Sequence, residues 1–318
     1  MTNQLNPFEK IVGQQQAVEL LTQAVECLRI APAYLFVGTA GVGRALAARC
    51  FLELLLISKK GSTVGVKRKL ENHPDLLWIE PTYLDRGKLL TTKEAQAAGL
   101  KRKAPPQIRL EQVRDIGEFL GRNPLEALRK VVVIEQAETM NESAANALLK
   151  TLEEPGQATL ILIAPGVDSL LPTLVSRCQR IPFYRLTDEQ MAEILLREGY
   201  EEILQNQAVL GMAQGSPGMA IACWQTLQEI PPELLEKPRQ FHFTTQQALE
   251  LAKQIDRTLD TPEQLWLLDY LQQAYWIASQ EQGIISDFPI HQFERARRNL
   301  LNYASPRLVW EVTLMGMS

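Results

Sequence analysis

The sequence predicts an α/β domain built on a parallel sheet, followed by a small helical domain and an all-α C-terminal domain. Three short apolar runs, 34–37, 131–134 and 159–163, have the composition of buried parallel strands, and helix-forming segments separate them. A glycine-rich loop directly follows the first run. After Arg185 the strand pattern stops and helical periodicity continues. The expected domains are residues 1–185, 186–230 and 231–318.

The loop after the first strand has the glycine framework of a phosphate-binding P-loop but lacks its two working side chains. The consensus G-x-x-x-x-G-K-[ST] puts a lysine on the β/γ phosphates and a hydroxyl on Mg²⁺. Gly38, Gly41 and Gly43 are present, but Arg44 stands at the lysine position and Ala45 at the hydroxyl position. A planar guanidinium is not equivalent to a compact ammonium, and alanine offers a metal no oxygen. The pattern indicates a loop inherited from an ATPase and no longer used as one.

The other elements of the α/β domain follow from periodicity and capping signals. An amphipathic helix is expected over 14–29, and strong helix formers predict another over 45–55. A third helix is predicted around 110–120. Asn141 fits the N-cap of a helix over 142–153, which the following Glu-Pro-Gly ends. Strands separated by helices in this way imply an open, mostly parallel sheet covered on both faces.

The stretch 59–106 differs in character, with basic clusters at 67–69 and 101–103. We interpret it as a basic insertion over the domain surface. Two explanations of its charge stay open, a contact with a DNA backbone and an ordinary solvated loop, of which we favour the loop.

The part of the chain after Arg185 carries helical signals only. A small helical domain is expected around the turn at 215–218, and Ile230-Pro231-Pro232 is expected to be a linker. Residues 261–264 combine an N-cap threonine, a proline at the first helical position and a capping partner, and so open a long helix. The aromatic side chains of that helix are expected to serve core or subunit packing: Trp266, Tyr270, Tyr275 and Trp276.

Composition excludes several classes of protein. With 33 basic and 37 acidic residues the net charge is −4, so any contact with nucleic acid has to be a local patch. No apolar run approaches the roughly 20 residues that span a bilayer, and the start of the chain lacks the regions of a signal peptide. We therefore expect a cytoplasmic protein with no membrane partner. No C-x-x-C pair occurs, so neither a zinc site nor a disulfide is expected among the four cysteines: Cys27, Cys50, Cys178 and Cys223.

The ends of the second and third predicted strands lack the groups that hydrolyse ATP. Glu135 stands where active P-loop ATPases hold Mg²⁺ with an acidic residue, usually the shorter aspartate. Gln136 follows, and an amide cannot act as a general base. Ala164 ends the third strand, where a polar residue normally senses the γ-phosphate. Because these losses coincide with those in the P-loop, they predict a chain that does not split ATP.

Several blocks of the sequence resemble the clamp-loader AAA+ family. The Ser-Arg-Cys motif of that family stands at 176–178, after the third predicted strand. The block 146–155 is similar to the family's segment behind the acidic strand, and 8–14 and 73–76 fit the same pattern. The resemblance covers essentially the whole chain, and an intact Ser-Arg-Cys motif beside a degenerate P-loop is similar to the family's non-catalytic subunit.

The resemblance implies that Arg177 is an arginine finger that reaches the ATP bound by a neighbouring motor subunit, with Ser176 and Cys178 flanking it in the motif. It implies an accessory subunit of a DNA-directed DNA polymerase holoenzyme with no intrinsic activity and no productively bound ATP or Mg²⁺. The resemblance also implies that residues 186–230 are a lid domain. Residues 231–318 are then a collar domain that joins a hetero-oligomeric ring. The implied partners are the gamma/tau and delta subunits, the β sliding clamp and primer-template DNA.

Two departures from the family pattern bear on these implications. Family members commonly carry a four-cysteine zinc module after the P-loop helix, but residues 51–134 contain no cysteine, so no zinc is expected. In ATP-hydrolysing relatives an arginine in the lid follows a Gly-Ser pair and reads the nucleotide. Here Gly218 follows Gly215-Ser216-Pro217, so that arginine is absent.

Two rival functions stay open. The first is a true ATPase that uses Arg44 in place of the P-loop lysine. The second is a free-standing DNA-binding module that uses the basic clusters at 67–69 and 101–103.

Overall fold

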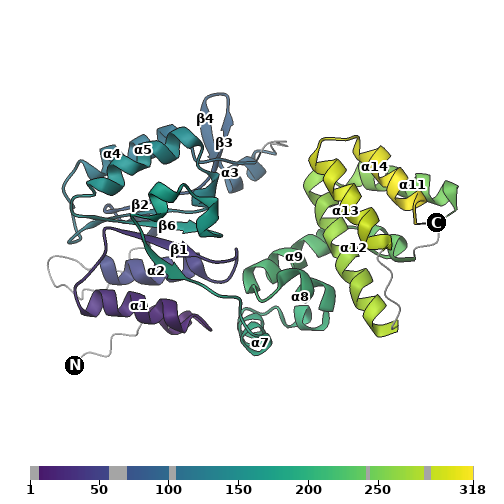
Figure 1. The fold of residues 1–318 in the computed structure, drawn as a ribbon, viewed down its shortest axis with the longest axis horizontal. Helices are drawn as coiled ribbons and strands as arrows, with labels where there is room; N and C mark the ends of the chain where they lie inside the picture. The colour runs from purple at the N-terminus through teal and green to yellow at the C-terminus, as the bar shows by residue number, and fades with distance from the viewer. Residues whose placement is uncertain (1–6, 57–69, 100–104, 241–243, 283–287, 318) are drawn as a thin grey trace. The chain divides into compact units, whose positions relative to one another are not determined.

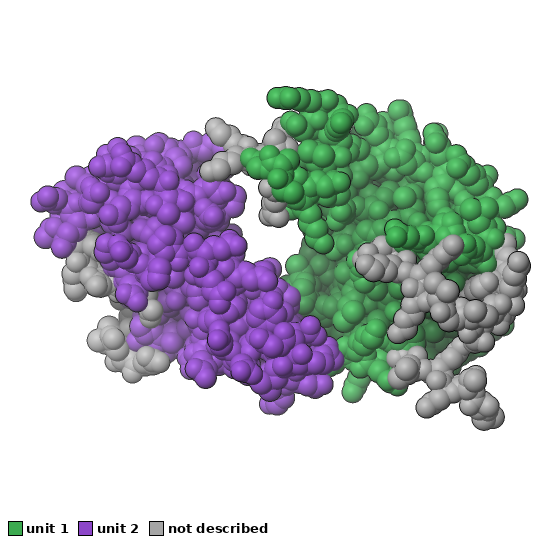
Figure 2. All heavy atoms as spheres, turned by 180° about the vertical axis from the view of Figure 1, so that it is seen from behind, with its two compact units in different colours: residues 1–185 green, residues 186–318 purple. Residues whose placement is uncertain are grey.

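The structure is a computed structural model that describes residues 7–56, 70–99, 105–240, 244–282 and 288–317. Contacts divide the chain into two compact units, Met1–Arg185 and Leu186–Ser318, which Figure 2 colours separately. Among the described residues, no helix combines the length and the apolar character needed to cross a membrane.

The first unit is built on a parallel sheet of five strands in the order β2-β5-β6-β1-β7. Because Val37 pairs with Ala164 and Ile134 pairs with Leu162, the carboxyl ends of β1, β5 and β6 meet along one side of the sheet. We call this side, at Val37, Ile134 and Ala164, the carboxyl edge. The strands are β1 (Ala33–Val37), β2 (Leu76–Ile79), β5 (Lys130–Ile134), β6 (Ala158–Ala164) and β7 (Gln179–Pro182).

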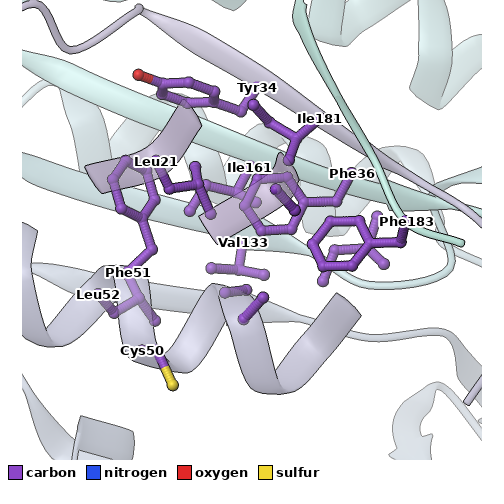
Figure 3. Packing of buried hydrophobic residues seen from close by; sticks show 14 of the residues in the cluster. Leu21, Tyr34, Phe36, Cys50, Phe51, Leu52, Val133, Ile161, Ile181 and Phe183 are labelled. Carbon is purple, nitrogen blue, oxygen red and sulfur yellow. The ribbon is translucent and has the colours of Figure 1, made fainter. Parts of the chain in front are cut away.

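Helices cover both faces of this sheet, which confirms the predicted α/β class (Figure 1). One face packs against α1 (Gln15–Glu26) and α2 (Arg44–Leu55), where Tyr34 of β1 meets Phe51 edge to face. Phe36 of the same strand lies beside Phe183 in this cluster (Figure 3). Leu35, between those two strand residues, points to the other face and packs in the cluster that contains Leu148. The side-chain alternation of a strand thus divides the core into two layers. The helices of the second face are α4 (Leu110–Leu120) and α5 (Glu142–Glu153), with the short α6 (Pro172–Val175) following β6.

The expected surface insertion over 59–106 differs from what is observed. Within it, β2 pairs with β5 and is part of the central sheet. A small hairpin, β3 (Thr82–Asp85) and β4 (Lys88–Thr91), follows with α3 (Thr92–Ala97). The apolar run at the start of β2 was too short to separate from its basic surroundings by composition alone. The basic clusters at 67–69 and 101–103 lie outside the described residues.

The second unit is helical throughout its described part. Trp266 packs against three neighbouring apolar clusters of this unit, and its ring stacks on Tyr270 at 5.4 Å between centroids. The predicted packing role of the aromatic side chains therefore holds for these two residues. The helices are α7 (Asp188–Arg197), α8 (Gln207–Ala213), α9 (Pro217–Glu229), α10 (Pro232–Glu236), α11 (Thr245–Thr258), α12 (Thr261–Gln282), α13 (Phe288–Leu301) and α14 (Pro306–Met315).

Two local expectations for this unit are wrong. Ile230 is buried and Pro232 begins α10, so the proline pair opens a packed helix, as proline does at a first helical position, and is no loose linker. The long helix is capped one residue earlier than expected. Asp260 accepts a hydrogen bond from the Glu263 N–H at 3.0 Å, and its own N–H donates to the Glu263 carboxylate at 2.6 Å. Both Asp260 and Thr261 have a capping partner three residues later. Asp260 is the N-cap because its side chain is a charged acceptor.

Candidate functional site

The P-loop connects β1 to α2 at the carboxyl edge, and its glycines have reasons that involve no phosphate. A Cβ on Gly38 would lie 2.5 Å from the carbonyl oxygen of Phe183, which follows β7. Gly41 and Gly43 have φ values of 79° and 102°, in the left-handed region that favours glycine. The glycine framework is therefore required by the fold of the chain alone, with or without a nucleotide.

The loop is also held by a buried glutamine. The Gln14 side-chain amide donates to the Val42 carbonyl at 3.2 Å and to the Tyr184 carbonyl at 2.7 Å. Its oxygen accepts a hydrogen bond from the Tyr184 N–H at 3.0 Å. Because Gln14 is only 2% exposed, these bonds replace contacts with water and fix the loop against the chain that follows β7.

Arg44, the first residue of α2, lies among carboxylates of its own chain. Burial lowers the pKa of Arg44, while the charges of Glu138 and Glu135 act in the opposite direction. Nη1 of Arg44 is buried without a hydrogen-bond partner, and so is Oε2 of Glu138. Burial raises the pKa of Glu138, which the charge of Arg44 opposes. The position of the P-loop lysine thus holds a cation that already faces internal anions.

The strand ends beside the P-loop present little that could act on a phosphate. Glu135 accepts a hydrogen bond from the Trp78 indole N–H at 3.0 Å. Gln136 is exposed and has a left-handed backbone with φ of 51°. Ala164 is fully buried, and its carbonyl accepts a hydrogen bond from the Gly38 N–H at 3.3 Å. The structure therefore brings together the predicted residues of the degenerate nucleotide site.

The donor set at the carboxyl edge does not suit a magnesium ion. Position 45 has no side-chain oxygen, and the Glu135 carboxylate is engaged by Trp78. Within the described ranges, no group of three or more His, Cys, Asp or Glu side chains is placed to hold a metal ion.

The Ser-Arg-Cys motif lies in the turn between α6 and β7. Nη1 of Arg177 donates to the Thr173 carbonyl at 3.0 Å, and Nη2 forms an ion pair with Glu153 Oε1 at 2.7 Å. The side chain of Arg177 remains 38% exposed. Ser176 donates its hydroxyl to the Thr173 carbonyl at 3.1 Å and so closes the turn.

The third residue of the motif is chemically quiet. Burial raises the pKa of the Cys178 thiol to about 11, so the group stays protonated at neutral pH and packs as a small apolar side chain. Of the three residues, only Arg177 presents charge to solvent and could act on a ligand of another molecule.

Three residues of these sites were not singled out from the sequence. Gln14 and Glu153 lie inside blocks that resemble the clamp-loader family, so the sequence marks their positions. It does not indicate which residues they contact. Glu138 had no signal, because a glutamate after a strand is ordinary on any surface. Each becomes informative only through a partner that is distant in the sequence.

Comparison with known proteins shows which family both units of the chain resemble. A family profile described as the delta subunit of DNA polymerase III matches residues 13–187. A second, described as the C-terminal domain of cyanobacterial DNA polymerase III delta prime, matches residues 189–317. Together the two profiles account for both compact units of the chain.

Individual relatives point to the same family. The DNA polymerase III delta prime subunit of Pseudomonas aeruginosa is 34% identical over 201 residues, which cover 59% of this chain and 54% of that protein. The delta prime subunit of Bacillus subtilis is 30% identical over 192 residues, covering 58% and 52%. The chain thus matches about half the length of these relatives.

A solved structure supports the fold. A DNA polymerase III gamma subunit-related protein of Thermotoga maritima superposes with a TM-score of 0.52 at 18% identity, covering 95% of this chain and 100% of that one. Because one profile spans more than half of the sequence and the other spans most of the rest, the assignment rests on the whole chain. The chain belongs to the delta prime family of DNA polymerase III subunits.

Proposed function

We propose that this chain is the non-catalytic delta prime subunit of a DNA polymerase III clamp loader. In this role it lends Arg177 as an arginine finger to a neighbouring ATPase and helps to load the β sliding clamp on primed DNA. The observation that carries the proposal is a contrast within one domain. An exposed guanidinium stands in the Ser-Arg-Cys turn, while the nucleotide site of the same chain lacks its hydrolytic groups.

The first part of the proposal is that the chain neither hydrolyses ATP nor binds ATP with Mg²⁺ productively. A P-loop ATPase needs a hydroxyl on Mg²⁺ and a group that orients the attacking water. Ala45 and Gln136 supply neither a metal ligand nor a general base. Arg44 faces Glu138 and Glu135, whose negative charge disfavours a triphosphate at the same place.

The second part is that Arg177 acts on the nucleotide of another subunit. A guanidinium carries five N–H donors, and two of them are used by Thr173 and Glu153. Three donors are left for a phosphoryl group at an exposed position. Such a cation stabilises charge on the transferred phosphoryl group without taking part in covalent chemistry.

The third part concerns assembly. Leu308, Val312 and Met315 recur at helical spacing on α14 and are 59%, 41% and 39% exposed. Tyr303, just before that helix, is 85% exposed. An apolar face of this kind fits contact with the helical domains of sister subunits in a hetero-oligomeric collar, the gamma/tau and delta subunits. The β clamp and primer-template DNA complete the proposed partners.

The direct test is Arg177→Ala in a clamp loader reconstituted with the ATP-hydrolysing and delta subunits. Assembly should be unchanged, and ATP turnover stimulated by clamp and primed DNA should fall by at least about 10³-fold at the site facing this subunit, the lower end for arginine fingers. Arg180→Ala, an exposed arginine on β7, is the matched control and should leave turnover unchanged. Wild-type turnover with Arg177→Ala would remove the finger assignment.

One observation favours the rival in which the chain itself hydrolyses ATP. The unpartnered, buried Nη1 of Arg44 is a donor that a phosphate oxygen could accept from. The purified chain without partners distinguishes the two functions. Turnover that Arg44→Ala abolishes would support the rival, and absence of turnover with ATP and Mg²⁺ supports the accessory subunit.

A further inference from the structure

The Arg177 side chain is held on two sides by its own chain. One guanidinium nitrogen contacts a backbone carbonyl of α6 at Thr173, and the other contacts the Glu153 carboxylate at the end of α5. Two planar N–H groups fixed in this way define the direction of the whole guanidinium plane. An exposed arginine without such contacts would instead sample many rotamers.

We propose that Glu153 is a positioning residue that presets Arg177 for the nucleotide of the neighbouring subunit. The proposal rests on the proposed function of Arg177 as a finger. Glu153 does not touch the nucleotide. It acts by reducing the number of side-chain orientations that Arg177 samples when the two subunits meet.

The location of Glu153 supports a role beyond helix stability. It is the last residue of α5, and Glu154 follows it at the C-cap. The C-terminal end of a helix carries partial negative charge, so a glutamate there is unfavourable for the helix itself. The buried Leu148 and Leu152 already anchor the helix on the sheet. Lys150 in the last turn compensates part of the charge at this helix end, and Arg177 pairs with Glu153 directly at 2.7 Å.

The strength of the ion pair decides whether Glu153 orients Arg177 or prevents it from reaching a phosphate. Both members of the pair are well exposed, at 38% for Arg177 and 53% for Glu153. Exposed ion pairs shift an equilibrium by at most about fivefold. An arginine finger changes the rate by roughly 10³–10⁵-fold. The pair is therefore far too weak to withhold Arg177 from a phosphate, but it suffices to bias its orientation.

The test uses the full chain, both within the reconstituted clamp loader and by itself. In the reconstituted clamp loader, Glu153→Ala should lower the kcat of stimulated ATP hydrolysis about twofold to fivefold and leave KM for ATP unchanged, which corresponds to about 0.4–1.0 kcal/mol at 1.36 kcal/mol per tenfold. Glu153→Gln keeps a hydrogen-bond acceptor and should recover part of the loss. In the chain by itself, the ¹⁵N guanidinium NMR signals of Arg177 should show faster rotation in Glu153→Ala than in the wild type.

Controls separate this proposal from the finger assignment. Glu154→Ala removes the neighbouring exposed carboxylate and should change neither readout. Glu153→Ala added to Arg177→Ala should cause no further loss, because the two residues act as one unit. Unchanged kcat, or a raised kcat, in Glu153→Ala would overturn the positioning role. Arg177→Ala without effect on turnover would instead overturn the finger itself, and the NMR signals of the free chain still report on the pair.

Discussion

Two arginines of the first unit, Arg44 and Arg177, occupy opposite environments. Arg44 begins the helix after the P-loop, with one nitrogen buried and unpartnered and two glutamates acting on its pKa. Arg177 stands in a surface turn, hydrogen-bonded on one side and open to solvent on the other. An arginine side chain thus faces anions of its own chain at position 44, whereas at position 177 it is accessible to other molecules.

The difference shows that residue type alone does not identify the functional cation. Arg44 lies in the more familiar motif, yet its surroundings disfavour a further anion. Arg177 lies in a short turn with few local signals, yet its donors are available. Under our proposal the chain keeps the fold of a nucleotide site, but its functional cation is the exposed Arg177. Substitutions in the two regions and in their surroundings test that contrast.

Gly38→Ala tests whether the P-loop is kept for structural reasons. The new methyl group would meet the Phe183 backbone at 2.5 Å, which a flexible side chain cannot relieve. We expect a loss of about 3 kcal/mol in the free energy of unfolding, measured by urea denaturation. Gly166→Ala, where nothing lies within 4 Å of the added group and φ is −160°, should cost less than about 0.5 kcal/mol. Equal effects would show that the loop is not constrained by β7.

Paired substitutions to lysine compare the two arginines directly. Lysine keeps the charge but loses the planar fork, so Arg177→Lys should lower stimulated ATP turnover of the complex about 100-fold, or about 2.7 kcal/mol. Arg44→Lys recreates the P-loop consensus cation but should leave turnover unchanged, because the hydroxyl and the water-orienting group are still missing. Steady-state hydrolysis assays of the two complexes provide the measurement. A gain of turnover in Arg44→Lys would contradict the contrast.

The pH dependence of stability should differ between two carboxylates, the buried Asp75 and the half-buried Glu138. Burial alone would raise the pKa of Asp75, but hydrogen bonds at 2.7 Å from the backbone N–H groups of 125–127 outweigh it and lower the pKa. Stability from Asp75 is therefore present above about pH 4, the ordinary value, and is lost as pH falls through the lowered pKa. Asp75→Asn should cost about 2 kcal/mol at pH 7 and flatten this acid dependence.

Glu138 should behave with the opposite sign, because its pKa is raised. Its contribution is lost as pH rises from the ordinary value through the raised one, so Glu138→Gln should be neutral or slightly stabilising at pH 7. Thermal unfolding of both variants between pH 3 and about 8 measures stability on both sides of the ordinary carboxylate values near pH 4. Parallel pH profiles for the two variants would contradict the assigned environments.

Gln14→Ala tests the tether between the P-loop and the chain after β7. Loss of the buried amide leaves the Val42 and Tyr184 carbonyls with fewer partners, and we expect about 1.5 kcal/mol of destabilisation. Gln16→Ala is the matched control, because Gln16 is exposed and its side chain accepts a hydrogen bond from the Tyr184 hydroxyl at 3.1 Å. It should change stability by less than about 0.5 kcal/mol. Calorimetric melting of the two variants distinguishes them.

Local signals predicted most of the fold. Strand runs such as 131–134, the helix after the P-loop and the Asn141 cap could be recognised because each depends on neighbours within a few residues. The Asn141 side chain does accept the Ala144 N–H at 2.8 Å. The Asp260 cap was missed because two overlapping residues offered the same signal. The strand β2 was missed because its four apolar residues lie within a stretch whose basic and polar composition is typical of a surface insertion.

The positions of the site residues could be predicted, but their contacts could not. Spacing within a motif located Arg44 and Arg177, since both motifs are continuous in the sequence. The bonds that define their surroundings span larger distances, 24 residues from Glu153 to Arg177 and 170 from Gln14 to Tyr184. No periodic pattern connects such pairs, so tertiary packing alone reveals which charge is compensated and which is available.

The close approach of Gly38 to Phe183 has an evolutionary consequence. β7 begins beside the Ser-Arg-Cys turn and ends where Phe183 presses on Gly38, so one short strand joins the two regions. A larger side chain at position 38 would therefore displace the strand that follows the turn. Selection on the turn is then sufficient to preserve Gly38, whether or not the loop binds a nucleotide.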